Sequence, residues 1–142
     1  MNNPEYIIIH HTALPYTTTS VEAIRRWQVD KRGFGDIGYH FVVRSARGLG
    51  VAEPGRDVTK RGAHCVGYNS RSIGVCIAGD WSKMDPSAHR RIFERAVALV
   101  RKLQEEYSIS TENVLGHREA HPGHTDCPGL KLDMDAFRAL LE

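Results

Sequence analysis

The chain has 142 residues, of which 41% are hydrophobic and 25% charged, and these proportions exclude a disordered or fibrous protein. Its length corresponds to a single domain spanning residues 1–142. Nineteen Lys and Arg residues against 17 Asp and Glu residues give a formal charge of +2, and so mild a balance argues against nucleic acid as a partner. No apolar run approaches the roughly 20 residues of a membrane-spanning helix. The start MNNPEYIII lacks the pattern of a secretory signal, so we expect none.

The chain opens with a predicted strand followed by a helix. Residues 6–12 contain three consecutive isoleucines, so both faces of this strand are apolar, which is typical of a central strand covered on both sides. Ser20 is expected to cap a helix that ends at Gly33. The helix residues predicted to face the core are Val21, Ile24 and Trp27.

The middle of the chain is predicted to form a hairpin, a long loop and another strand. Residues 39–44 and 50–52 are expected to pair across a turn at residues 46–48. Residues 53–71 are rich in glycine and basic residues and have no periodicity, which indicates a long surface loop, and long loops in compact domains are usually functional. Residues 73–78 are predicted to form a second buried strand.

The last third is predicted to hold a long amphipathic helix, a short strand and a closing helix. The first helix begins at Asp85 and Pro86, and its expected apolar stripe is Ile92, Ala96, Leu99, Val100, Leu103 and Tyr107. Residues 114–115 form the short strand. The closing helix follows Asp133, and its expected buried residues are Met134, Phe137, Leu140 and Leu141. This order of elements predicts a single α/β domain with a central mixed β-sheet flanked by helices.

Histidine and cysteine are grouped in two places. His10 and His11 end the first predicted strand, and the segment GHREAHPGHTDCPG carries His117 and Cys127. Neutral imidazole and thiolate are ligands that zinc favours. Because successive side chains of a strand point to opposite faces, only one of the two adjacent histidines can join such a site. The odd total of three cysteines argues against a disulfide framework.

The spacing of these residues predicts a catalytic zinc site. Paired short spacings such as CxxC, which are typical of structural zinc fingers, are absent, and so is the HExxH motif of thermolysin-like enzymes. Three protein ligands would leave one position of the ion open for water. From the residues alone, plainer explanations remain open: solvated surface histidines and a cysteine that fills a gap in the core.

Four segments of the chain resemble the type 2 N-acetylmuramoyl-L-alanine amidases, a family that includes phage endolysins and peptidoglycan recognition proteins. The segments occur in the family's order: IIIHHTA at the start, DIGYHFVVR at 36–44, GAHCVGYNSRSIGVCIAGD at 62–80 and GHREAHPGHTDCPG at 116–129. The resemblance implies the amidase and recognition-protein fold. It also implies a zinc-dependent hydrolase that cuts the amide between N-acetylmuramic acid and the L-alanine of the stem peptide.

The resemblance implies three zinc ligands and two catalytic residues. The ligands are His10, His117 and Cys127. Tyr39 matches a tyrosine near the metal and is expected to orient water or to hydrogen-bond the tetrahedral intermediate. Thr125 stands where phage enzymes often have lysine and animal recognition proteins have threonine, and its hydroxyl is expected to hydrogen-bond the developing oxyanion.

Further roles follow from the same resemblance. His64 and Asn69 match residues on the substrate-facing wall of the recognition proteins and are expected to bind the glycopeptide. His11 is expected to face away from the metal or to support its ligands. For Glu119 a surface ion pair is the favoured interpretation, with orientation of a metal ligand as the alternative.

The expected partner is bacterial peptidoglycan, with no nucleic acid, no membrane insertion and a monomeric chain. The leading hypothesis is a phage-type endolysin that is made in the cytoplasm and acts on the wall after release. A recognition module that binds muropeptides without cutting them is the alternative. A structural zinc protein with no open coordination position is a third. Because all three ligand positions are filled, the sequence favours the enzyme.

Overall fold

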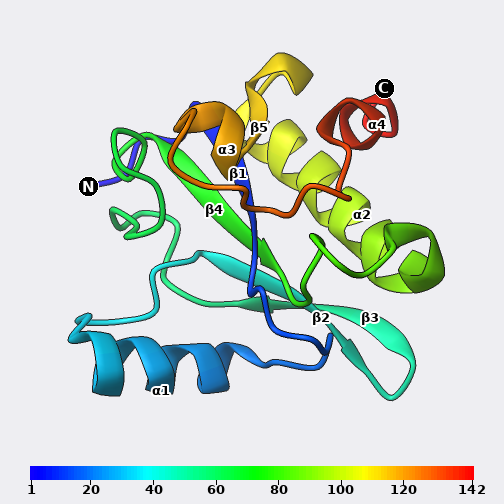
Figure 1. The fold of residues 1–142 in the computed structure, drawn as a ribbon. Coiled ribbons are helices and arrows are strands. Elements are labelled where there is room, and N and C mark those ends of the chain that lie inside the picture. The colour runs from blue at the N-terminus through cyan, green and yellow to red at the C-terminus, as the bar shows by residue number, and fades with distance from the viewer.

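A five-stranded sheet organises the chain in the computed structural model, which describes all 142 residues (Figure 1). The strands are β1 (Tyr6–His11), β2 (Phe41–Ala46), β3 (Leu49–Pro54), β4 (Ser72–Ile77) and β5 (Val114–Gly116). Their order across the sheet is β3-β2-β4-β1-β5. The β2–β3 pair is antiparallel and the other three pairs are parallel. The predicted mixed sheet in a single α/β domain is therefore confirmed.

Strand β1 lies inside the sheet, between β4 and β5. Ile7, Ile8 and Ile9 are all fully buried, because the sheet is covered on both faces and each isoleucine packs on one face or the other. Every residue of β4 is also buried. The consecutive isoleucines thus predicted the right environment for β1.

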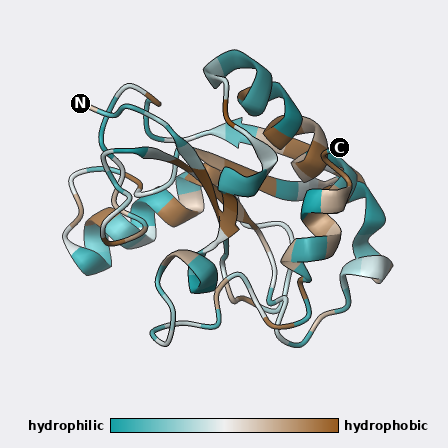
Figure 2. Cartoon of the chain, turned by 90° about the horizontal axis from the view of Figure 1, so that it is seen from above, coloured by the Kyte–Doolittle hydropathy of each residue, from teal (hydrophilic) through white to brown (hydrophobic).

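Helices cover both faces of the sheet (Figure 1). Helix α1 (Val21–Arg32) packs Val21 and Ile24 on one face, where Val42 of β2 and Cys76 of β4 meet them. Helices α2 (Arg90–Tyr107) and α4 (Met134–Ala139) cover the opposite face and complete the larger part of the core. Figure 2 shows the hydrophobic colour concentrated along the central strands and on the inner sides of the helices.

Helix α1 begins and ends where the sequence predicts, but one of its core residues is different. The Ser20 hydroxyl accepts a hydrogen bond from the Ala23 amide, and Gly33 ends the helix in the left-handed region at φ 71°. Trp27 was expected in the core and is 52% exposed. Gln28 is buried in its place, because it lies on the same stripe as Val21 and Ile24 and its amide oxygen accepts a hydrogen bond from Gly38.

The hairpin and the last two predicted helices agree with the structure apart from their ends. Strand β2 begins and ends two residues later than predicted, so it starts after Tyr39, and β3 extends beyond the predicted residues at both ends. A 3₁₀ turn (Pro86–His89) capped by Asp85 precedes α2, whose buried residues all belong to the predicted stripe. Leu140 was expected to be buried and is 61% exposed, because it lines an open groove beside α2, whereas Leu141 is buried as predicted. No helix is both long and apolar enough to cross a membrane.

Two short elements flank β5. A 3₁₀ turn (Thr111–Asn113) leads into β5, and a four-residue helix, α3 (His117–Ala120), follows it directly. Helix α3 was not predicted, because a single turn leaves no periodic pattern in the sequence. It sits at the carboxyl ends of β1 and β5, the edge of a parallel sheet where ligands commonly bind.

Candidate metal centre

Three potential metal ligands meet at the carboxyl ends of β1 and β5. Since Ile9 of β1 is in register with Gly116 of β5, the residues that follow, His10 and His117, reach the same edge of the sheet. Their rings lie 4.7 Å apart. The sulfur of Cys127 lies 3.7 Å from Nδ1 of His10. One ligand atom from each of the three residues falls within 4.8 Å of the others.

Backbone hydrogen bonds hold Cys127 in place although it belongs to a loop. Its carbonyl accepts a hydrogen bond from the Arg118 amide at 2.7 Å, which ties the loop back to α3. Its amide donates to the Thr125 hydroxyl at 3.0 Å. The His11 amide donates to the Cys127 sulfur at 3.4 Å. The loop therefore presents the sulfur to the two histidines in a defined position.

The electrostatics of this cluster suit a divalent cation. Burial lowers the pKa of both His10 and His117, so both imidazoles are neutral at pH 7 and each keeps a free lone pair. Burial raises the pKa of the Cys127 thiol to about 12, against the opposing effects of the His11 amide and Arg118. A thiolate at this position therefore needs a cation to compensate its charge. Two imidazole nitrogens and one thiolate are a donor set that zinc prefers.

His11 points to the other face of the sheet. Its Nδ1 accepts a hydrogen bond from the Trp81 amide at 3.2 Å, on the side covered by α2. The alternation of side chains along β1 thus separates the two adjacent histidines. Only His10 joins His117 and Cys127.

A pocket of about 530 Å³ contains the cluster and brings together the other residues singled out in the sequence. Tyr39 lines it, with its ring 5.1 Å from the His10 ring. Burial, and secondarily the thiols of Cys76 and Cys127, raise the pKa of the Tyr39 phenol well above its ordinary value. The phenol is therefore protonated at neutral pH and able to donate a hydrogen bond. Thr125 also lines the pocket, although its hydroxyl oxygen already accepts from the Cys127 amide.

His64 and Asn69 line the same pocket but are engaged in internal hydrogen bonds. Nδ1 of His64 lies 2.9 Å from Nε2 of His10, and its Nε2 lies 3.2 Å from the Ser72 hydroxyl. The amide oxygen of Asn69 accepts from the backbone amides of His64 and Cys65, at 2.7 and 2.9 Å. Asn69 thus shapes the loop that carries His64. The proposed glycopeptide contacts of these two residues stay a prediction.

The structure adds pocket residues to which the sequence assigned no role. They are Gln28, Arg32, Phe34, Ala63, Cys65, Val66, His121 and His124. The guanidinium of Arg32 lies over the rings of both Trp27 and Phe34, at 5.4 and 5.5 Å from their centroids. The rings of His121 and His124 are stacked 4.0 Å apart. The two histidines had a signal in the motif GHREAHPGHTDCPG, whereas nothing local to Arg32 indicated that it would face this pocket.

Glu119 forms an ion pair away from the three ligands. Its carboxylate accepts two hydrogen bonds from Arg138, at 2.8 and 2.9 Å, and one from the Gly116 amide at 2.8 Å. Burial opposes ionisation of Glu119, but these hydrogen bonds outweigh it and lower the pKa. The predicted ion pair is thus present, and it ties α4 to the start of α3.

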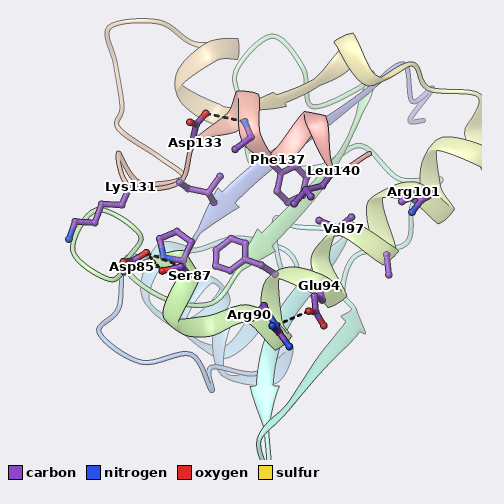
Figure 3. Close-up of a pocket in the computed structure, with 15 residues that line it drawn as sticks. Asp85, Ser87, Arg90, Glu94, Val97, Arg101, Lys131, Asp133, Phe137 and Leu140 are labelled. Atoms are coloured by element: carbon purple, nitrogen blue, oxygen red, sulfur yellow. Dashed lines mark hydrogen bonds and ion pairs between the residues drawn. The ribbon is translucent and has the colours of Figure 1, made fainter. Parts of the chain in front are cut away.

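A second groove, of about 560 Å³, lies between α2 and α4 (Figure 3). Figure 3 shows Val97, Phe137 and Leu140 facing it, with charged side chains such as Arg90 and Glu94 at its rim. It contains none of the three candidate ligands. None of the site residues predicted from the sequence therefore lines this groove.

Comparison with solved structures places the chain among the peptidoglycan amidases and peptidoglycan recognition proteins. The N-acetylmuramoyl-L-alanine amidase LysC from Clostridium intestinale URNW superposes with a TM-score of 0.82 at 27% identity, covering 99% of this chain and 86% of LysC. Wild-type Drosophila PGRP-LB superposes with a TM-score of 0.77 at 28% identity, covering 93% of this chain and 78% of that one.

Residues 1–130 match the model of the N-acetylmuramoyl-L-alanine amidase family, and the chain belongs to this family. It is 33% identical over 143 residues to the human N-acetylmuramoyl-L-alanine amidase, and 33% identical over 135 residues to peptidoglycan-recognition protein LB of Drosophila melanogaster. These alignments cover 87% and 89% of this chain, but only 22% and 55% of the two relatives. The resemblance seen in the sequence is confirmed, as is the fold that it implied.

Proposed function

We propose that the protein is a zinc-dependent hydrolase that cleaves the amide between N-acetylmuramic acid and the L-alanine of the peptidoglycan stem peptide. The observation that carries this proposal is the complete His10, His117 and Cys127 set, with its ligand atoms within 4.8 Å of one another in a pocket. Family membership supports the reaction. A muropeptide ligand is supported by the similar structure of a Drosophila PGRP-LB variant solved in complex with tracheal cytotoxin.

The roles of the residues follow from their placement. His10, His117 and Cys127 would hold the metal through two neutral imidazoles and one thiolate. Zinc, when bound, supplies a Lewis acid that polarises a carbonyl and makes water more acidic. The protonated Tyr39 phenol donates a hydrogen bond to the carbonyl oxygen as negative charge develops there. Thr125 fixes the Cys127 amide with its hydroxyl oxygen, which leaves the hydroxyl proton available for the developing oxyanion.

The proposal extends to a role as a phage-type endolysin that acts on the wall after release from the cytoplasm. The endolysin of Enterobacteria phage T3 supports this extension, with 41% identity over 76 residues, which cover 53% of this chain and 48% of that protein. Addition of the purified protein to outer-membrane-permeabilised bacteria should lower their turbidity. Intact cells after such treatment would contradict the lytic role, without bearing on the amidase reaction.

The test of the reaction is digestion of purified peptidoglycan followed by mass analysis of the fragments. The expected products are glycan strands without stem peptides and free peptides that begin with an L-alanine amine. A chelator should stop their release, and added zinc should restore it. Binding of muropeptides with no cleavage, by protein that holds one zinc per chain, would contradict the proposal and favour a recognition module.

A further inference from the structure

His64 lies directly behind the candidate ligand His10. Its Nδ1 is 2.9 Å from Nε2 of His10, and its Nε2 is 3.2 Å from the hydroxyl of Ser72. His10 is 1% exposed and Ser72 is fully buried. Side chains from β1, β4 and the loop before β4 thus form one hydrogen-bonded series, buried at His10 and at Ser72, that runs from the metal pocket into the sheet.

Ser72 determines the direction of the hydrogen bonds that link Ser72, His64 and His10. The Ser72 hydroxyl donates its single proton to the Tyr68 carbonyl at 2.7 Å, since a carbonyl oxygen can only accept. Ser72 must therefore accept from His64, which places the His64 proton on Nε2. With the proton of His64 on Nε2, its Nδ1 carries a lone pair, and at 2.9 Å from His10 this atom accepts the Nε2 proton of His10.

This direction determines the tautomer of His10. A neutral imidazole carries one proton, and the hydrogen bond to His64 holds the proton of His10 on Nε2. The free lone pair of His10 is then on Nδ1, the atom that lies 3.7 Å from the Cys127 sulfur. The protonation pattern that His10 needs as a metal ligand is therefore imposed from Ser72 through His64.

We propose that His64 is a positioning residue of the metal centre, which with Ser72 holds His10 in the orientation and tautomer that bind zinc. This inference rests on the proposed function, because it requires a metal at the His10, His117 and Cys127 cluster. Both ring nitrogens of His64 are engaged within the protein, which suits a supporting role, and the glycopeptide contact of His64 stays a separate prediction. Supporting hydrogen bonds of this kind to metal-binding histidines typically contribute about 10- to 100-fold to metal affinity or activity.

The surroundings of His64 allow little freedom for its ring. A Cβ atom added at Gly74 or at Gly62 would lie 2.6 Å from the ring carbon Cδ2 of His64, so the ring occupies the space that both glycines leave open. Gly74 belongs to β4 and is in register with Ile8 of β1. The pairing of these two strands therefore fixes the distance between Gly74 and His10. The backbone amide of His64 is held by Asn69 at 2.7 Å. Backbone and ring are thus both constrained in the position that reaches His10.

Zinc affinity in the absence of substrate tests the proposal, because a residue that only contacts substrate does not alter it. His64→Leu removes both ring nitrogens at similar volume, and we expect the zinc dissociation constant, measured by competition with a chromophoric chelator, to rise about 10- to 100-fold. His64→Asn keeps an acceptor near the position of Nδ1 and should restore most of the affinity. Ser72→Ala leaves His64 in place but removes its acceptor, and a rise of several-fold, about 3 to 10, is expected.

The matched control is His124→Gln, which changes a histidine of the same pocket that forms no hydrogen bond with His10. Its zinc affinity should stay within about twofold of the wild type, a change of under ~0.5 kcal/mol. The absorption spectrum of the Co²⁺-substituted protein gives a second readout. His64→Leu should shift the Co²⁺ bands, whereas His124→Gln should leave them unchanged.

The outcomes separate this inference from the proposed function. A wild type that binds zinc and cleaves the amide, together with His64→Leu and Ser72→Ala variants of wild-type zinc affinity and unchanged cobalt spectra, would overturn the positioning role and leave the amidase intact. If the wild type binds no zinc, both proposals fail. If His64→Leu does not fold, as judged by circular dichroism of the zinc-free protein, the His64→Asn and Ser72→Ala affinities decide.

Discussion

The sulfur of Cys127 lies 3.7 Å from Nδ1 of His10, although the two residues are 117 positions apart in the chain. One belongs to an interior strand and the other to a loop tied to α3 by the Arg118 amide. The fold thus creates the candidate metal centre by joining the beginning of the chain to its last third.

Replacement of Cys127 by serine should remove the metal centre. A serine hydroxyl is a poor substitute for a thiolate ligand of zinc, and loss of a ligand should exceed the roughly 100-fold upper range for a supporting residue. We expect both zinc affinity and release of stem peptides to fall by more than that factor. Cys65→Ser is the matched control, because Cys65 is buried outside the ligand cluster, and this variant should still bind zinc.

Replacement of Tyr39 by phenylalanine should separate catalysis from metal binding. The change removes only the phenol hydroxyl, which is protonated at neutral pH, and leaves the ring beside His10. We expect kcat to fall by about 100-fold or more, with the zinc dissociation constant unchanged within about twofold, or ~0.5 kcal/mol. Steady-state kinetics on a soluble muropeptide provides the measurement. A Tyr39→Phe enzyme with wild-type kcat would exclude a catalytic role for this hydroxyl.

The ion pair of Glu53 and Arg44 should make the free energy of unfolding depend on pH under acidic conditions. Glu53 accepts hydrogen bonds from Arg44 at 3.1 Å and from the Val21 amide at 3.0 Å, and the bond from Arg44 is the main reason that its pKa is lowered. A carboxyl whose pKa is lowered by folding stabilises the native state above its unfolded pKa, about 4.3, and this contribution is lost as pH falls through the lower folded value.

Glu53→Gln should therefore lower the free energy of unfolding by about 1 kcal/mol at pH 7. The difference from the wild type should shrink as the pH falls below about 4. Urea denaturation at pH 7 and at pH 3 measures both values. A difference that persists undiminished at the lower pH would point to packing, instead of charge, as the cause.

The apolar stripe of α2 should account for much of the stability of the sheet face that it covers. Ile92 is 1% exposed within the larger part of the core, and Ile92→Ala should lower the free energy of unfolding by about 2–5 kcal/mol. Glu105 lies on the exposed face of the same helix, and Glu105→Ala should change stability by less than about 0.5 kcal/mol. Thermal unfolding of the two variants under one set of conditions tests the assignment of the faces.

Local signals in the sequence were enough to predict most of the fold. The caps at Ser20 and Gly33 and the isoleucines of β1 depend on neighbouring residues alone, and each is found where expected. Trp27 shows the limit of this reasoning. Its spacing allowed it to join the buried stripe, and only the packing of α1 on the sheet shows that Gln28 is buried instead.

The candidate site, like the fold, could be predicted from the sequence only in part. Motif resemblance selected His10, His117 and Cys127, and the structure brings them together. The link from His10 to His64, 54 residues away, and from there to Ser72 could not be predicted, because it depends on the register of β1 with β4 and on the path of a loop. No local pattern in the sequence encodes that geometry.

The zinc content of the purified protein and of its Cys127→Ala variant tests the central claim most directly. After equilibrium dialysis against a small excess of zinc, elemental analysis should find one zinc per wild-type chain and none in the variant. Equal zinc content in the two proteins, or none in the wild type, would contradict a metal centre built from His10, His117 and Cys127.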